Sequence, residues 1–188
     1  MQTKEKPTIL DYCQYLISSQ INYTVTNLAD HLQKWSHDTL KRHLGNERIT
    51  ASDLWKNVSK IIEVDEDGFI LFDDSVLDKN YSYDIEIVKW QYSGNAHKVI
   101  KGIGLVNCVY VNPKTDRFWV IDYRIYHPDT DGKNKNEHVK EMINNLIFHK
   151  KIPFKTILMD KWYASAPMMM FIDSLNKIFY CPIVSSRL

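Results

Sequence analysis

Apolar residues in the first third of the chain recur at intervals of three and four, which is the spacing of an amphipathic helix. This spacing predicts short helices over residues 8–18, from residue 26 or 27 to residue 35, over residues 37–44 and over residues 51–61. The inward face of the first helix is expected to consist of Ile9, Tyr12, Cys13, Leu16 and Ile17. Ser36 is the expected N-cap of the third helix, and Thr50 with Asp53 forms a capping-box pattern ahead of the fourth. Residues 1–62 are therefore predicted to form an all-helical domain.

From residue 63 onward the apolar pattern changes to the period of two that is typical of β-strands. Strands are expected over residues 69–75, 101–111 and 117–126, and the last two are expected to form a hairpin. A helix over residues 139–147, a strand over 156–160, a helix over 165–175 and a strand over 177–181 follow. The order β-β-β-α-β-α-β predicts an α+β or α/β fold class, in which a helical domain (residues 1–62) precedes a mixed domain (residues 63–188).

The composition restricts the functions that the chain can have. Hydrophobic residues make up 44% and charged residues 25% of the 188 residues, so most of the chain should fold. The formal net charge of +1 excludes a bulk-basic nucleic-acid-binding protein, and any contact with nucleic acid must come from local basic patches. The widely spaced Cys13, Cys108 and Cys181 indicate neither a disulfide framework nor a zinc knuckle.

The sequence contains no stretch that resembles a secretory signal or that reaches membrane-spanning length. Charged residues at Lys4, Glu5 and Lys6 interrupt the N-terminal segment. We therefore expect a cytoplasmic protein that has no membrane partner.

Two of the predicted strands end in acidic residues. The first ends in Asp73 and Asp74, and the fourth ends in Asp160. Active sites in sheets with helical crossovers gather outside the carboxyl ends of adjacent parallel strands. Neighbouring carboxylates repel each other, and a hard cation such as Mg²⁺ relieves this repulsion while it completes its shell with water and phosphate oxygens. The pattern therefore indicates a phosphodiester substrate.

The same aspartates also have a structural explanation. Strand alternation directs Asp73 and Asp74 to opposite faces, so only one of them can join Asp160 directly, and the pattern does not choose between them. In the structural explanation, Asp74 caps a turn and Asp160 caps the helix that follows it. Both explanations are open at this point.

Three segments together resemble insertion-sequence transposases of the Asp-Asp-Glu (DDE) superfamily. They are FDDSVLDK at residues 72–79, YSGN at 92–95 with KGIGLVN at 101–107, and LMDKWYA at 158–164. The segments WSHD at residues 35–38 and LW at 54–55 resemble the helical N-terminal domain of the same group. The resemblance covers nearly the whole chain.

The resemblance implies a partial ribonuclease H-like domain in which the first catalytic Asp precedes a Ser or Thr at the end of the first strand. This rule selects Asp74, and it makes Asp160 the second catalytic and metal-binding residue. The implied cofactor is Mg²⁺, for which Mn²⁺ can substitute, and the implied reaction is DNA strand cleavage followed by strand transfer. The third acid of the family is a Glu on a helix after the fifth strand. We expect it to be missing here, and we expect the chain alone to be inactive.

Two basic groups are candidates for contact with DNA. They are Lys41, Arg42 and His43, and then His97, Lys98 and Lys101. The first group lies on the second helix of a helix-turn-helix-like pair, the element that enters the major groove in such domains. The second group lies in a segment rich in aromatic residues, a composition that suits stacking on unpaired bases. The alternatives are a merely solvated helix face for the first group and a hairpin with inward-packed aromatic residues for the second.

Three functional hypotheses follow. The first is a DNA transposase, associated with the bacterial nucleoid, that binds double-stranded transposon ends, with a second copy of the chain as a candidate partner on that DNA. The second is a truncated, inactive relative that acts only by binding DNA. The third is a ribonuclease H-like nuclease whose remaining ligands are Asp122, Asp129 and Asp131. Whether the chain is an enzyme by itself is left open by the sequence.

Overall fold

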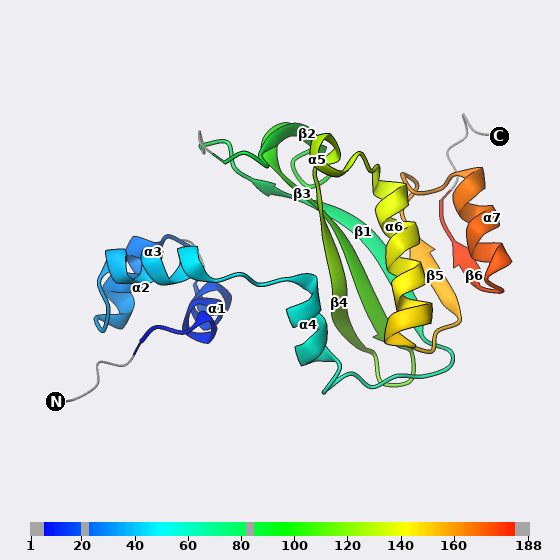
Figure 1. The fold of residues 1–188 in the computed structure, drawn as a ribbon, viewed down its shortest axis with the longest axis horizontal. Coiled ribbons are helices and arrows are strands. Elements are labelled where there is room, and N and C mark those ends of the chain that lie inside the picture. Colours follow the sequence, from blue (N-terminus) through cyan, green and yellow to red (C-terminus); the bar gives the residue numbers. More distant parts are fainter. Residues whose placement is uncertain (1–5, 20–22, 82–84, 183–188) are drawn as a thin grey trace. The chain divides into compact units, whose positions relative to one another are not determined.

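The computed structural model describes residues 6–19, 23–81 and 85–182, and the chain divides into two compact units. The first unit is Met1–Ile49 and the second is Thr50–Leu188. Figure 1 shows helices in the first unit, and a sheet accompanied by helices in the second. Each unit has a hydrophobic core of its own.

Three helices form the described part of the first unit. They are α1 (Ile9–Ser18), α2 (Val25–Leu32) and α3 (His37–Asn46). Each begins after a residue whose hydroxyl accepts a backbone hydrogen bond from the first turn, namely Thr8, Thr24 and Ser36. One buried residue from each helix forms the centre of the core: Tyr15, Leu28 and Leu40. The three expected helices and the Ser36 cap are confirmed.

The inward face of α1 differs from the expected one. Leu16 and Ile17 are 36% and 86% exposed, whereas Tyr15 is only 6% exposed. The Tyr15 hydroxyl donates to the Thr24 carbonyl oxygen at 3.2 Å and accepts from Asn27 Nδ2 at 2.6 Å. A tyrosine can bury its ring when its hydroxyl finds such partners, so the apolar pattern alone selected the wrong face.

A six-stranded mixed sheet forms the centre of the second unit. Its strands are β1 (Phe69–Asp78), β2 (Lys89–Ser93), β3 (Lys98–Asn112), β4 (Arg117–Tyr126), β5 (Thr156–Met159) and β6 (Ile178–Tyr180). The helices of this unit are α4 (Ala51–Val58), α5 (Pro128–Asp131), α6 (Lys135–Asn144), the π-helix η1 (Asn145–Lys150) and α7 (Ala166–Ser174). Within the described residues, no helix is both long enough and apolar enough to span a membrane.

Strand β1 joins the antiparallel and parallel parts of the sheet. It pairs antiparallel with β3 on one side and parallel with β5 on the other, and β5 pairs parallel with β6. The other edge of β3 pairs with β2 over residues 98–102 and with β4 over residues 104–112. The predicted order is therefore confirmed with one addition, the strand β2, which lies in a segment where the sequence offered a hairpin only as an alternative.

Strands β2 and β3 form a hairpin at the β2 edge of the sheet. Its turn ends at His97, whose φ of 50° lies in the left-handed region. Trp90 and Tyr92 on β2 are 70% and 52% exposed. The hairpin considered in the sequence analysis is thus present, but these two aromatic side chains do not pack inward.

One face of the sheet carries the core of the second unit. Residues of β3 alternate between buried and half-buried from Ile100 to Asn112, as expected when every second side chain points to the same face. Helices α6 and α7 cover this face (Figure 1). The large side chains buried between the sheet and the helices include Phe72, Tyr110, Met142, Ile157, Tyr163 and Met168.

Helix α4 belongs to the second unit, although the sequence placed it in the first. It lies beside β4, and its residues Trp55 and Val58 pack against the core of the sheet (Figure 1). The Lys150 Nζ atom lies 5.2 Å from the centre of the Trp55 ring. The boundary between the units therefore falls between Ile49 and Thr50 instead of near residue 62.

The packing of α4 predicts that Trp55→Ala lowers the free energy of unfolding of the full chain by about 2–3 kcal/mol, because a packed aromatic ring and its contact with an ammonium group are lost. Urea denaturation followed by circular dichroism measures this change. Trp90→Ala is the matched control, because the exposed Trp90 side chain should contribute less than about 0.5 kcal/mol. Equal effects of the two substitutions would contradict the docking of α4 on the sheet.

Candidate active site

A cleft with a volume of about 720 Å³ opens at the carboxyl ends of β1 and β5. Its walls come from the end of β1, from β2 and the turn after it, from the start of α6 and from the segment that follows β5. Asp73, Asp74 and Asp160 all line it. A cleft of this size accommodates a ligand as large as a nucleotide unit.

The strand register explains why the aspartates meet. The parallel pairing of β1 with β5 runs from Phe69 opposite Thr156 to Phe72 opposite Met159. The next residue on each strand is an aspartate, Asp73 on one and Asp160 on the other. The expected adjacency of the two acid-ended strands is confirmed.

Asp73 and Asp74 differ in their surroundings. Asp74 lies on the same side of β1 as the buried Phe72, its side chain is 18% exposed, and it forms an ion pair with Lys135. Asp73 is exposed, and its Oδ1 atom accepts a hydrogen bond from the Asp74 backbone N–H at 2.8 Å. The register therefore places Asp73 beside Asp160. Asp74 differs from Asp73 in that it is less exposed and pairs with a positively charged side chain.

The capping explanation of these aspartates does not describe the structure. Asp74 lies inside β1, which continues to Asp78, so it caps no turn. Asp160 Oδ1 accepts from the Lys161 backbone N–H at 2.5 Å, but the N-cap residue of α7 is Ser165. Neither carboxylate therefore has the capping role that was considered, and both line the cleft.

Lys135 is a site residue that the sequence analysis missed. It is the first residue of α6, whose start is fixed by a capping box between Asn134 and Glu137. Its ammonium group contacts Asp74 and lies 5.3 Å from the centre of the Tyr126 ring. The Asn134 and Glu137 pattern signals a helix start, but it does not show which strand end this helix faces.

Tyr163 is buried beneath the aspartates. It is 1% exposed, and its hydroxyl has no hydrogen-bond partner within the described residues. Burial raises the pKa of Tyr163 above its ordinary value, and the negative charges of Asp74, Asp73 and Asp160 raise it further. The phenol therefore stays protonated and remains a hydrogen-bond donor close to all three carboxylates.

The residues of the cleft fit a hard divalent cation. Asp74 and Asp160 offer carboxylate oxygens, and the buried Oδ1 atom of Asn136 has no hydrogen-bond partner in the described part of the chain. No group of three or more His, Cys, Asp or Glu side chains in the described ranges is arranged to hold a metal ion. A cation that keeps several water molecules and accepts one or two carboxylates, such as Mg²⁺, matches this donor set.

The aspartates proposed for the nuclease hypothesis lie outside the cleft. Asp122 is 1% exposed and pairs with Lys150 and Arg124. Asp129 forms an ion pair with Lys89, and Asp131 lies 3.3 Å from His138 Nε2. The structure therefore gives these three residues separate surroundings instead of a common site.

The candidate DNA-binding residues also lie outside the cleft, in two places. On α3, Lys41 and Arg42 are exposed, whereas His43 is partly buried and its Nε2 atom lies 3.4 Å from Glu47. His97 and Lys98 are exposed at the turn of the β2–β3 hairpin.

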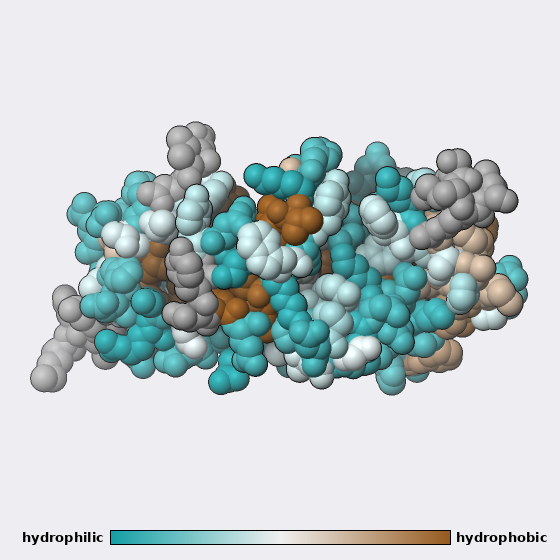
Figure 2. All heavy atoms as spheres, turned by 90° about the horizontal axis from the view of Figure 1, so that it is seen from above, coloured by the Kyte–Doolittle hydropathy of each residue, from teal (hydrophilic) through white to brown (hydrophobic). Residues whose placement is uncertain are grey.

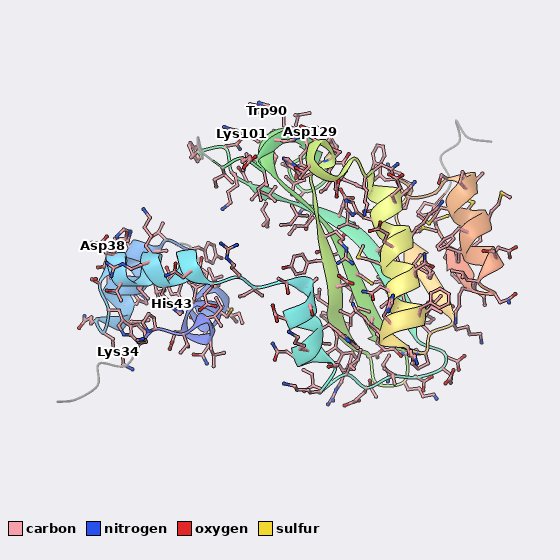
Figure 3. All side chains as sticks on the ribbon, in the orientation of Figure 1. Lys34, Asp38, His43, Trp90, Lys101 and Asp129 are labelled. Carbon is pink, nitrogen blue, oxygen red and sulfur yellow. The ribbon has the colours of Figure 1, made fainter. Side chains whose placement is uncertain are left out.

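Lys101 lies opposite Trp90 in the β2–β3 hairpin, and Figure 3 labels both residues. Viewed from above, hydrophilic residues cover much of the surface, with hydrophobic residues exposed among them near the middle of the view (Figure 2).

Comparison with solved structures supports the fold. The cryo-EM structure of the piggyBac transposase synaptic complex with hairpin DNA is similar, with a TM-score of 0.53, 12% identity, and coverage of 98% of this chain and 44% of that chain. The Mos1 transposase paired-end complex with the left transposon end gives a TM-score of 0.34 and 14% identity, covering 95% of this chain and 60% of that chain. The chain thus spans less than two thirds of the length of either transposase. The first likeness shows the ribonuclease H-like fold that the sequence implied.

Comparison at the level of sequence gives the family. No curated protein matches the chain. A family model described as DDE superfamily endonuclease, however, matches residues 2–187, almost the whole length. The chain belongs to the DDE superfamily of endonucleases.

Proposed function

We propose that the chain is part of an insertion-sequence transposase that cleaves and transfers DNA strands with the help of Mg²⁺ or Mn²⁺. The observation that carries this proposal is the cleft beside β1 and the end of β5, which both Asp74 and Asp160 line, in a member of the DDE superfamily. One solved structure with a similar fold is a synaptic complex of the piggyBac transposase with hairpin DNA. Asp74 and Asp160 are the proposed metal ligands.

We assign a separate role to each polar residue in or near the cleft. A bound divalent cation would activate the attacking oxygen and stabilise the leaving oxygen of a phosphodiester. Asp74 and Asp160 would hold this cation, and the carbonyl oxygen of the Asn136 side chain would accept a hydrogen bond from a coordinated water or from the DNA. The protonated Tyr163 phenol, which has no hydrogen-bond partner among the described residues, would donate to a carboxylate that turns towards it when the cation binds.

The proposed DNA contacts come from both units. Lys41 and Arg42 of α3 would neutralise phosphates of the double-stranded transposon ends, with His43 beside them. On the hairpin, His97, Lys98 and Lys101 would hold the backbone near the exposed Trp90. A second copy of the chain on the same DNA is part of this proposal.

A second candidate function is DNA binding without catalysis. The observation that favours it is the lack, within the described residues, of three acidic or other metal-binding side chains arranged around one ion. In that case the cleft would hold a cation weakly or not at all, while the basic residues of α3 and the hairpin would still bind DNA. Metal binding by the cleft therefore separates the two functions.

The catalytic proposal predicts that the full chain binds Mn²⁺ and that Asp74→Asn and Asp160→Asn each weaken this binding at least about tenfold, because each removes a charged oxygen ligand. Titration monitored by the electron paramagnetic resonance signal of free Mn²⁺ measures the affinity. Asp129→Asn is the control, since Asp129 lies outside the cleft. A weaker effect for Asp74→Asn than for Asp73→Asn would move the first ligand to Asp73, and no binding by the unaltered chain would favour the non-catalytic function.

The DNA-binding proposal predicts an affinity for duplex DNA that falls steeply with added salt, because each neutralised phosphate releases condensed counterions. Lys41→Ala and Arg42→Ala should each lower the slope of log affinity against log salt concentration by about one. Fluorescence anisotropy with a labelled duplex at several salt concentrations measures the slope. Lys151→Ala, an exposed charge of the second unit, should leave it unchanged, and a slope that no α3 substitution alters would exclude this helix from the interface.

A further inference from the structure

Lys135 is the only Lys, Arg or His side chain that lines the cleft within the described residues, and it stands opposite three aspartates. Its ammonium group forms an ion pair with Asp74 Oδ2. The two side chains are 29% and 18% exposed, so solvent screens this pair only in part. A positive charge is therefore already present at the carboxylate to which the proposed function assigns the cation.

The backbone position of Lys135 is fixed, whereas its side chain can move. The capping box between Asn134 and Glu137 holds the first turn of α6 in place, with the Asn134 side chain accepting from Glu137 N and the Glu137 carboxylate accepting from Asn134 N at 2.7 Å. Lysine carries its charge on a flexible stem of four carbons with three donor hydrogens. Its Nζ atom also lies over the face of the Tyr126 ring, which lines the same cleft.

We propose that Lys135 is an internal counter-ion that holds Asp74 in the metal-free protein, is displaced from Asp74 by the divalent cation, and then binds a phosphate oxygen of the DNA. This inference rests on the proposed function, because it assumes that Asp74 is a cation ligand and that the substrate is a phosphodiester. The inference adds Lys135, a residue of α6, to the residues that contact the substrate.

Electrostatics gives the reason for the exchange. Three carboxylates in one cleft repel each other, and a single ammonium group relieves part of that repulsion when no other cation is present. A divalent cation on Asp74 repels the ammonium group at close range, so the two compete for this carboxylate. A phosphodiester that enters the cleft brings a new negative charge, to which a lysine donates a charge-assisted hydrogen bond.

A purely structural salt bridge is a weaker explanation of the pair. Partly exposed ion pairs contribute little to stability, and the first turn of α6 is already fixed by its capping box. A structural pair would also leave cation affinity and DNA affinity unaffected once the fold is intact. The counter-ion role predicts that both change, and in opposite directions.

The first test is Mn²⁺ binding by the full chain, with the thermal melting temperature of each variant recorded alongside. Lys135→Met keeps the stem and removes the charge, and it should tighten Mn²⁺ binding about tenfold because the competing cation is gone. Lys135→Arg keeps the charge and should bind Mn²⁺ within about twofold of the unaltered chain. Lys133→Met is the matched control, since Lys133 lies two residues earlier, pairs with Glu141 and does not line the cleft.

The second test is binding of a short DNA duplex with Ca²⁺ present, which occupies oxygen sites like those for Mg²⁺. The measured quantity is the ratio of the DNA affinity with Ca²⁺ to the DNA affinity with a chelator. In Lys135→Met this ratio should fall at least about fivefold, because a charge-assisted hydrogen bond to phosphate is lost. In Lys133→Met it should stay unchanged. If Lys135→Met melts well below the unaltered chain, Lys135→Gln serves in its place, with the same expected directions.

The outcomes separate this inference from the proposed function. Mn²⁺ binding that depends on Asp74 but is unchanged or weakened in Lys135→Met and Lys135→Gln would overturn the counter-ion role and leave the metal site standing. No Mn²⁺ binding by the unaltered chain, or binding unaffected by Asp74→Asn, would overturn both. Tighter Mn²⁺ binding together with a lost Ca²⁺-dependent gain in DNA affinity supports the exchange.

Discussion

The parallel pairing of β1 with β5 is the constraint on which the cleft depends. Four consecutive residue pairs, from Phe69 with Thr156 to Phe72 with Met159, fix how the two strands align. A slip by one residue would turn the buried Phe72 to the opposite face, so burial of the core specifies this register strongly. The aspartates beyond the last pair are therefore brought together by the apolar packing of the residues just before them, which include Phe72 and Met159. Their own mutual repulsion would otherwise drive them apart.

The cleft carries more negative than positive charge, and this excess favours the binding of a cation. Three carboxylates face one ammonium group, that of Lys135, and a buried phenol that remains protonated. The packing of the large apolar core stabilises the fold and offsets the repulsion between these carboxylates. The remaining negative charge attracts a cation. The Tyr163 hydroxyl and the Asn136 side-chain oxygen have no hydrogen-bond partner among the described residues, and a buried polar group without a partner costs free energy until a ligand or water supplies one.

The sequence predicted those parts of the fold whose signals are local. Ser36 and the Thr50–Asp53 capping box mark helix starts in both the sequence and the structure, because capping involves residues only three apart. The end of β5 just before Asp160 was likewise visible as a change in apolar period, whereas β1 does not end at Asp74 as expected but continues to Asp78. The docking of α4 and the approach of Lys135 to Asp74 were not visible, since each depends on contacts between residues distant in sequence. The strand β2 was missed for another reason, because its aromatic residues Trp90 and Tyr92 are exposed and it has no inward apolar pattern. An amphipathic pattern shows that a helix buries one face, but not what covers that face.

The contrast between Asp122 and the cleft aspartates shows how a structure separates acids that look alike in sequence. Asp122 accepts hydrogen bonds from Lys150 Nζ at 2.8 Å, Arg124 at 2.5 Å, Asn145 Nδ2 at 3.2 Å and the Tyr123 backbone N–H at 2.8 Å. With four donors around a buried carboxylate, its lone pairs are occupied, and a metal ion would have to displace a network that also holds the π-helix η1 against β4. Among the described residues, Asp74 has one charged partner and Asp160 has a single backbone donor. Free lone pairs on carboxylates that open into a cleft, and not acidity alone, therefore mark the residues that can bind a cation.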